Sequence, residues 1–277
     1  MSEEPPSKIL ARPELPSSCL VVAWSEDSGK LGPKVVDYLN KKLDGQEFAQ
    51  IDPDDFFPLD GVSVEGDVAQ FPESKFYWCQ GKNLVVFKST PPWSDWYEFL
   101  NSVIDIAERL CKVKVLYTIG GMVSLGAHTA PRALLAVANS PEAKEVLSEY
   151  ELASDLNFET PPGQRPTLSS FLLWVAKRRN IAGANLWVPI PFYLVAAEDP
   201  RAWRKVAGFL DTRFGLDIDF EDLDEEVAKQ DHKIAQVRKQ IPEIDGYITR
   251  LESNLSLTAD ESEKLVKEME ELLRERH

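Results

Sequence analysis

The sequence has 277 residues, of which 43% are hydrophobic, so it can form one large core and still leave chain for an appendage. Its formal net charge of -15 gives an acidic surface, which disfavours nucleic acids and anionic membranes as partners because they carry the same sign. No run is long and apolar enough to span a bilayer, and the first residues lack the apolar centre of a signal peptide. We therefore expect a cytoplasmic protein.

The three cysteines, Cys19, Cys79 and Cys111, lie far apart in the sequence and lack the spacing of metal ligands. An odd number also argues against a disulfide framework. Cys19 and Cys111 adjoin apolar runs, so we expect buried, reduced thiols there.

The first part of the chain predicts strands that alternate with helices. Residues 1–18 are expected to form an N-terminal arm, either mobile or lying on the surface as a strand. Apolar runs bounded by turn residues predict the strands, and apolar residues at helical spacing predict the helices. The expected elements are a strand at Cys19–Trp24, a helix at Lys30–Leu43, a strand at Glu47–Ile51, a hairpin with strands at Lys75–Gln80 and Leu84–Lys88, and a helix at Trp93–Leu110.

The run Val113–Ile119 is short, apolar and rich in β-branched residues, and it stops at Gly120-Gly121. This pattern is typical of a buried strand at the centre of a sheet. A flexible loop is expected at Gly120–Gly126, followed by polar residues up to Arg132. Ligands of open α/β sheets usually bind beyond the carboxyl ends of the strands, so this loop is the first place to look for a site.

The alternation continues to residue 216. It predicts an α/β core domain over residues 19–216, in which helices cover both faces of a central sheet. The expected elements are a strand at Ala133–Ala138, a helix opened by Ser140 and Pro141, a helix at Leu168–Arg179, a strand at Ala184–Pro189, and a helix at Pro200–Phe214 that Gly215 ends.

Residues 217–277 are charged and rich in leucine, which predicts a separate helical region. Its apolar residues alternate spacings of three and four, the pattern of a coiled-coil seam. Pro242 should end one helix after Ile241 and begin the next, and a last helix is expected at Thr258–Arg276. We favour an appendage folded on its own chain over an intermolecular coil. The seam residues are Ile234, Val237, Ile241, Ile244, Ile248, Leu251 and Leu255.

His128 is the one histidine in a plausible catalytic setting, with Ser124, Thr129 and Arg132 nearby in the sequence. It could act as an acid or base or help to clamp an anion, or it could be a loop histidine that bonds the backbone. Ser124 lacks the Gly-x-Ser-x-Gly spacing of a nucleophile elbow. No cluster of histidines or cysteines suggests a metal, so we assign no catalytic residue, no metal and no cofactor.

The glycines of the expected loop have two interpretations. Gly120 and Gly121, with Gly126, could cradle a phosphate through backbone amides, or they could simply let the chain leave the strand sharply. Aromatic residues next to prolines, among them Phe192 and Tyr193, could form a recognition surface or pack in the core.

Three sequence blocks resemble the PAC2 family of proteasome assembly chaperones, in its archaeal and bacterial type with a helical C-terminal tail. The resemblance as a whole covers most of the chain, from about Leu20 to the end. They are Ile119-Gly120-Gly121 through Ala127-His128-Thr129-Ala130-Pro131-Arg132, the block Asn185-Leu186-Trp187-Val188-Pro189-Ile190-Pro191-Phe192-Tyr193-Leu194, and Gly215-Leu216-Asp217-Ile218-Asp219 leading into Leu223.

The resemblance implies a mixed-sheet α/β fold of the phosphorylase or hydrolase type, homo-oligomers and usually no demonstrated catalysis. In chaperone members, a C-terminal hydrophobic-Tyr-any tripeptide docks on proteasome α subunits. This chain ends Glu275-Arg276-His277, so that docking element is not expected here. The chain also departs from the family at Ala130, where Arg is usual, and at Phe192, where many members have His.

The sequence therefore supports three hypotheses. The first is a non-enzymatic, homo-oligomeric proteasome-assembly-chaperone-like protein that binds protein partners. The second is a protein or enzyme that binds a nucleoside or phosphate-containing ligand through the loop Gly120–Arg132, and the third is a purely structural oligomer assembled through the tail. The expected ligand or partner loop comprises Gly120, Gly121, Ser124, His128, Thr129, Arg132, Phe192 and Tyr193.

Overall fold

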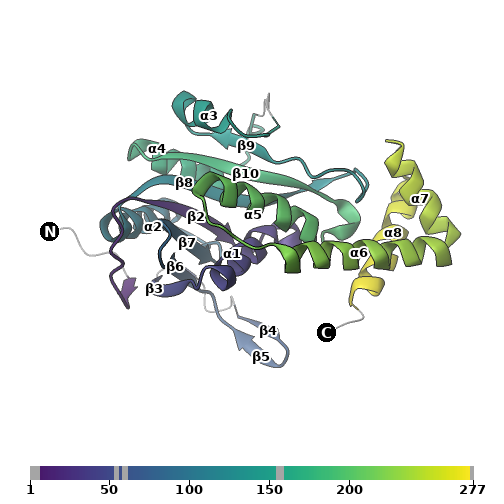
Figure 1. Cartoon of the computed structure of the whole chain (residues 1–277), viewed down its shortest axis with the longest axis horizontal. Helices are drawn as coiled ribbons and strands as arrows, with labels where there is room; N and C mark the ends of the chain where they lie inside the picture. The colour runs from purple at the N-terminus through teal and green to yellow at the C-terminus, as the bar shows by residue number, and fades with distance from the viewer. Residues whose placement is uncertain (1–6, 53–55, 58–61, 154–158, 275–277) are drawn as a thin grey trace. The chain divides into compact units, whose positions relative to one another are not determined.

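The computed structural model describes residues 7–52, 56–57, 62–153 and 159–274 (Figure 1). The start of the expected arm, residues 1–6, and the chain end Glu275-Arg276-His277 lie outside this part. The chain divides into two compact units. Unit 1 comprises Met1–Glu26, Gly32–Ile119 and Leu135–Leu186, and unit 2 comprises Asp27–Leu31, Gly120–Leu134 and Trp187–His277.

The main sheet has eight strands within the described residues, in the order β1-β3-β6-β7-β2-β8-β10-β9. The central strand β2 (Ser18–Trp24) is buried along its whole length and pairs in parallel with two neighbours. Pairs β1–β3, β3–β6 and β6–β7 are antiparallel, so the sheet is mixed, as expected. The other strands are β1 (Ser7–Ile9), β3 (Gln46–Ile51), β6 (Ser74–Cys79), β7 (Leu84–Ser89), β8 (Val113–Ser124), β9 (Leu135–Ala138) and β10 (Ala182–Pro191).

Helices cover both faces of this sheet in unit 1. On one face, Leu20 and Val22 of β2 share a buried core with α2 (Trp96–Cys111) and α4 (Leu168–Arg178). Ala23 points to the opposite face, because successive side chains of a strand alternate. There it meets Gly32 of α1 (Leu31–Lys42), where an added Cβ would lie 3.1 Å from the Ala23 Cβ. The predicted α/β architecture is therefore confirmed.

Two smaller features of unit 1 follow from its sequence. The hairpin predicted around Gly81 is formed by β6 and β7, with Phe76 opposite Phe87. Strands β4 (Ser63–Glu65) and β5 (Val68–Gln70) make a separate two-stranded sheet (Figure 1). All three cysteines are buried and free, and burial raises the pKa of both Cys79 and Cys111 to about 12, so these thiols stay protonated near neutral pH.

The prediction of a flexible loop at Gly120–Gly126 is wrong, because β8 continues through Gly120 and Gly121 to Ser124. Glycine is needed there for close approach: an added Cβ at Gly121 would lie 2.0 Å from the Ser28 carbonyl oxygen. At Gly120 it would lie 2.9 Å from the Trp187 ring. Strand β9 is present where a strand was predicted, and it begins at Leu135.

Unit 2 contains α5 (Pro200–Phe214), which ends at Gly215 in the left-handed conformation, as predicted. The tail forms α6 (Glu221–Gln240), α7 (Pro242–Glu252) and α8 (Ala259–Arg274), each in contact with the other two (Figure 1). The predicted break at Ile241 and Pro242 is confirmed. Ile234, Ile244 and Ile248 are fully buried, so α6 and α7 pack their apolar residues within this chain.

Short elements complete the described chain: the helical turns η1 (Ser28–Lys30) and η3 (Phe192–Leu194) and the helix α3 (Pro141–Leu147). Ser140 caps α3 by accepting a hydrogen bond from the Ala143 amide, as its sequence predicts. Among the described residues, we find no helix with the length and apolarity needed to cross a membrane.

Candidate functional site

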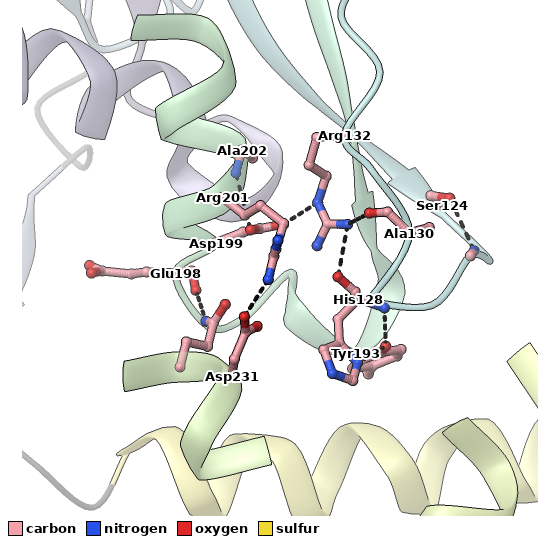
Figure 2. Close-up of polar contacts among 12 residues, drawn as sticks. Ser124, His128, Ala130, Arg132, Tyr193, Glu198, Asp199, Arg201, Ala202 and Asp231 are labelled. Carbon is pink, nitrogen blue, oxygen red and sulfur yellow. Dashed lines mark hydrogen bonds and ion pairs between the residues drawn. The ribbon is translucent and has the colours of Figure 1, made fainter. Parts of the chain in front are cut away.

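His128 and Tyr193 form the centre of the candidate site in unit 2. The Tyr193 hydroxyl oxygen accepts a hydrogen bond from the His128 amide at 2.6 Å and lies 2.8 Å from His128 Nδ1 (Figure 2). Because the amide already donates to this oxygen, the hydroxyl proton is free to bond Nδ1. That arrangement assigns the neutral histidine tautomer with its proton on Nε2.

Burial keeps both members of this pair uncharged. His128 is 6% exposed, and desolvation lowers its pKa from 6.5 to about 4. The charges that act on it largely oppose one another: Asp231 and Glu252 raise the pKa, whereas Arg238 and Arg132 lower it. Burial likewise raises the pKa of Tyr193 far above its ordinary value. At neutral pH the pair therefore supplies no charge to bind an anion.

Arg132 is the cation of the loop, and it is buried against Asp199. Its Nε donates to Asp199 Oδ2 at 2.9 Å, and its Nη1 donates to the carbonyl oxygens of Ala130 at 2.8 Å and His128 at 3.3 Å (Figure 2). Asp199 also caps α5, since its Oδ1 accepts from the Ala202 amide at 3.1 Å. The guanidinium thus fixes the shape of its own loop and carries a paired charge.

Thr129 connects the loop to the tail helix α7. Its Oγ1 donates to Glu252 Oε1 at 3.1 Å, and Arg238 donates to both oxygens of the same carboxylate, at 2.7 and 3.1 Å. Hydrogen bonds from Arg238 are the main reason that the pKa of Glu252 is lowered. Helix α8 in turn packs against η3, the turn that carries Tyr193. The loop is therefore built into the fold of unit 2.

The remaining predicted site residues have separate local contacts. Ser124 Oγ accepts a hydrogen bond from the Gly126 amide at 3.1 Å, and the Gly121 amide donates to Asp27 Oδ1 at 2.8 Å. Phe192 is half-buried and packs edge-on against Tyr193, with ring centroids 5.2 Å apart. The structure therefore brings His128, Thr129, Arg132 and the two aromatic residues together, and leaves the glycines and Ser124 along the strand.

Two acidic partners in this arrangement, Asp199 and Glu252, were not predicted as site residues. Asp199 carries a local signal, because an Asp before Pro200 is typical of a helix N-terminus. Its pairing with Arg132, 67 residues away, is a tertiary contact with no local pattern. Glu252 lies 123 residues from Thr129 and has no such signal.

The chemical repertoire of this arrangement is narrow. Ser124 bonds a neighbouring amide and His128 Nδ1 bonds Tyr193, so the two side chains form no nucleophile–base pair. Within the described ranges, no three His, Cys, Asp or Glu side chains gather as a metal site would require. The polar groups of the loop are used chiefly to hold the loop itself.

The sequence matches the model of a known protein family. The model of the PAC2 family matches residues 23–238. A search of curated proteins gave no match.

Three solved structures illustrate the likeness. A PAC2 family protein from Streptomyces avermitilis is 18% identical and covers 79% of this chain and 95% of its own, with a TM-score of 0.65. Rv2714, a Mycobacterium tuberculosis protein of unknown function, is 19% identical over 92% of this chain and 90% of its own, with a TM-score of 0.76. PbaB of Pyrococcus furiosus, described as an archaeal proteasome activator, is 18% identical over 84% of this chain and 98% of its own, with a TM-score of 0.65.

At these identities the solved structures show a shared fold, while the family model spans most of the sequence. The chain belongs to the PAC2 family.

Proposed function

We propose that this chain is a non-enzymatic, homo-oligomeric, proteasome-assembly-chaperone-like protein that acts in the cytoplasm through protein–protein contacts. The observation that carries this proposal is the use of the loop's polar groups within unit 2: His128 with Tyr193, Arg132 with Asp199, and Thr129 with Glu252. Such a loop positions a surface and offers little chemistry.

Apolar side chains at the end of β8 support the same proposal. Met122, Val123 and Leu125 are 41%, 55% and 75% exposed. They lie next to the polar cluster in sequence, where a ligand-binding strand end would present polar groups. Grouped exposed apolar side chains are more typical of a protein-binding surface than of a phosphate site. The loop Gly120–Arg132, with Phe192 and Tyr193, is therefore proposed as a partner-binding loop.

The choice of partner rests on family membership. Because PbaB, a structure of the same fold, is described as a proteasome activator, a proteasome-related protein is the first partner to test.

The nucleoside or phosphate alternative has less support from the geometry. A phosphate at the loop would need the Arg132 guanidinium or the glycine amides. The guanidinium is ion-paired with Asp199, and the Gly121 amide donates to Asp27. Binding there would have to break a buried ion pair first, which opposes affinity.

Affinity purification of the tagged chain from its own cells, followed by mass spectrometry and rebinding of purified components, tests the proposal. We expect one protein to be recovered at fixed stoichiometry and to rebind the purified chain. A parallel thermal-shift screen with nucleosides and sugar phosphates should show no stabilisation, whereas a ligand at 100 times its Kd would add about 2.7 kcal/mol. Recovery without a protein partner, together with such stabilisation, would favour the alternative.

A further inference from the structure

The outer surface of α2 and α4 in unit 1 carries a cluster of aromatic side chains, which we call the aromatic patch: Trp96, Tyr97, Phe171 and Trp174. The rings of Phe171 and Trp174 stack with centroids 5.3 Å apart, and Tyr97 lies 6.4 and 6.0 Å from them. Trp96 lies 6.5 Å from Phe171. The four rings thus form one connected surface across two helices.

Part of this patch belongs to the edge of the core, because Trp96 and Phe171 are half-buried and pack against it. The opposite sides of the two helices already bury Phe99, Val103 and Leu172 against the sheet. Tyr97 and Trp174 are nevertheless 48% and 43% exposed, and Trp93, just before α2, is 79% exposed. Large, rigid aromatic side chains that remain in water after the core is complete are typical anchors of protein interfaces.

The charges beside the patch are arranged by sign. α2 and α4 run in the same direction, because Tyr97 near the start of α2 meets Phe171 and Trp174, and residues further along α2 bond Arg179 near the end of α4. Asp95 and Glu98 are exposed at the start of α2, whereas Lys177 and Arg178 are exposed at the end of α4. Asp105 and Glu108 also lie at the end of α2, where Arg179 pairs with them. Together with Arg109, the cations at this end still outnumber its carboxylates, so the patch has an acidic end and a basic end.

We propose that the aromatic patch is an isologous interface with a second copy of this chain. In a two-fold interface each patch faces the same patch turned around, so the acidic end of one copy meets the basic end of the other. The chain's net charge of -15 opposes self-association, and such local complementarity offsets the repulsion where the copies touch. The Cζ atom of Arg178 lies 4.8 Å from the centroid of the Trp174 ring, so the basic end of the patch is in direct contact with its aromatic side chains.

This inference deepens the proposed homo-oligomer by naming its surface, and sedimentation equilibrium on the full chain tests it. We expect Trp174→Ala and Tyr97→Ala each to weaken self-association by about 30-fold or more, as removal of a buried aromatic anchor does. Leu255→Ser is the matched control, since it removes an apolar side chain that is 57% exposed in unit 2, and it should leave association unchanged. Urea unfolding of each variant checks that the chain still folds.

A charge exchange tests the two-fold arrangement. Glu98→Lys and Arg178→Glu should each weaken association, and the double variant should recover it, because the reversed ends again oppose each other. A double variant no better than the single variants would overturn this arrangement.

The remaining outcomes separate the patch from the function. A wild-type chain that is monomeric at all concentrations would overturn both the patch proposal and the homo-oligomer. A wild-type oligomer that Trp174→Ala and Tyr97→Ala leave intact would overturn the patch alone. If those variants abolish capture of a different protein and spare self-association, the second-copy assignment is wrong.

Discussion

The Tyr193 hydroxyl oxygen lies 2.6 Å from the backbone nitrogen of His128 and 2.8 Å from its ring Nδ1, so one side chain fixes both the loop and the histidine tautomer. Tyr193 is 1% exposed, and its turn packs against helix α8. The histidine that the sequence offers as a candidate catalyst is thereby held by structural contacts.

Tyr193→Phe should lower the free energy of unfolding by about 1–3 kcal/mol, because the buried His128 amide loses its acceptor. Tyr247→Phe is the control: its hydroxyl donates to the exposed Glu243, so water can replace that bond and the loss of stability should be much smaller. Urea unfolding measures both. Equal effects would show that the hydroxyl at Tyr193 has no special structural role.

His128 should make stability depend on pH between about 4 and 6.5. Its folded pKa, about 4, lies below the ordinary 6.5, so the unfolded chain binds more protons in this range. The contribution of His128 to the free energy of unfolding is complete above pH 6.5. It decreases as the pH falls toward 4, by up to about 3 kcal/mol.

His128→Gln should remove this part of the dependence, whereas His232→Gln, which changes an exposed histidine on α6, should retain it. Urea titrations at several pH values between 4 and 7.5 provide the measurement. A wild-type curve that is flat across that range would contradict the assignment of His128 as a buried neutral side chain.

Arg132→Ala should destabilise the chain by about 3–5 kcal/mol, because Asp199 would remain as a buried charge without its partner. The side chains of this pair are 4% and 1% exposed. Lys229→Ala removes an ion pair with Glu226 whose side chains are 59% and 56% exposed, and it should have a much smaller effect because solvent screens such a pair. Suppose instead that the wild-type chain binds an anion, and that Arg132→Ala abolishes this binding while lowering the free energy of unfolding no more than the control does. Arg132 would then have a ligand-binding role in place of the structural one.

Gly121→Ala should be strongly destabilising, since its Cβ would lie 2.0 Å from the backbone oxygen of Ser28. Gly126→Ala is its matched control, because the nearest atom there, Ser124 Oγ, would be 3.4 Å away. Thermal unfolding should show a large decrease in Tm for the first variant and a small change for the second. Similar values would mean that the strand can shift to admit a side chain.

Local pattern was enough to predict much of the fold. Proline and glycine act within one or two turns, so Pro242, Gly215 and Ser140 could be assigned to helix ends from sequence alone. The apolar run Val113–Ile119 likewise predicts a buried strand, and this run forms the first part of β8. The same local reasoning misled at Gly120-Gly121, where glycine usually breaks a strand. Here Trp187 and Ser28 crowd the strand, a tertiary reason that no neighbouring residue reveals.

The candidate site was less predictable than the fold. His128, Thr129 and Arg132 were found because they follow the central strand in sequence. Their partners Tyr193, Glu252 and Asp199 lie 65, 123 and 67 residues further along, so the bonds that make the loop structural could not be read from spacing. The tail seam shows a related limit, since spacings of three and four suit a coil between chains as well as helices packed within one chain.

Native mass spectrometry of the chain purified from its own cells tests whether the protein acts through contacts with other protein chains. We expect a mass that contains two or more copies of the 31.2 kDa chain together with a defined protein partner. A single 31.2 kDa chain that carries a bound small molecule and no other protein would contradict it.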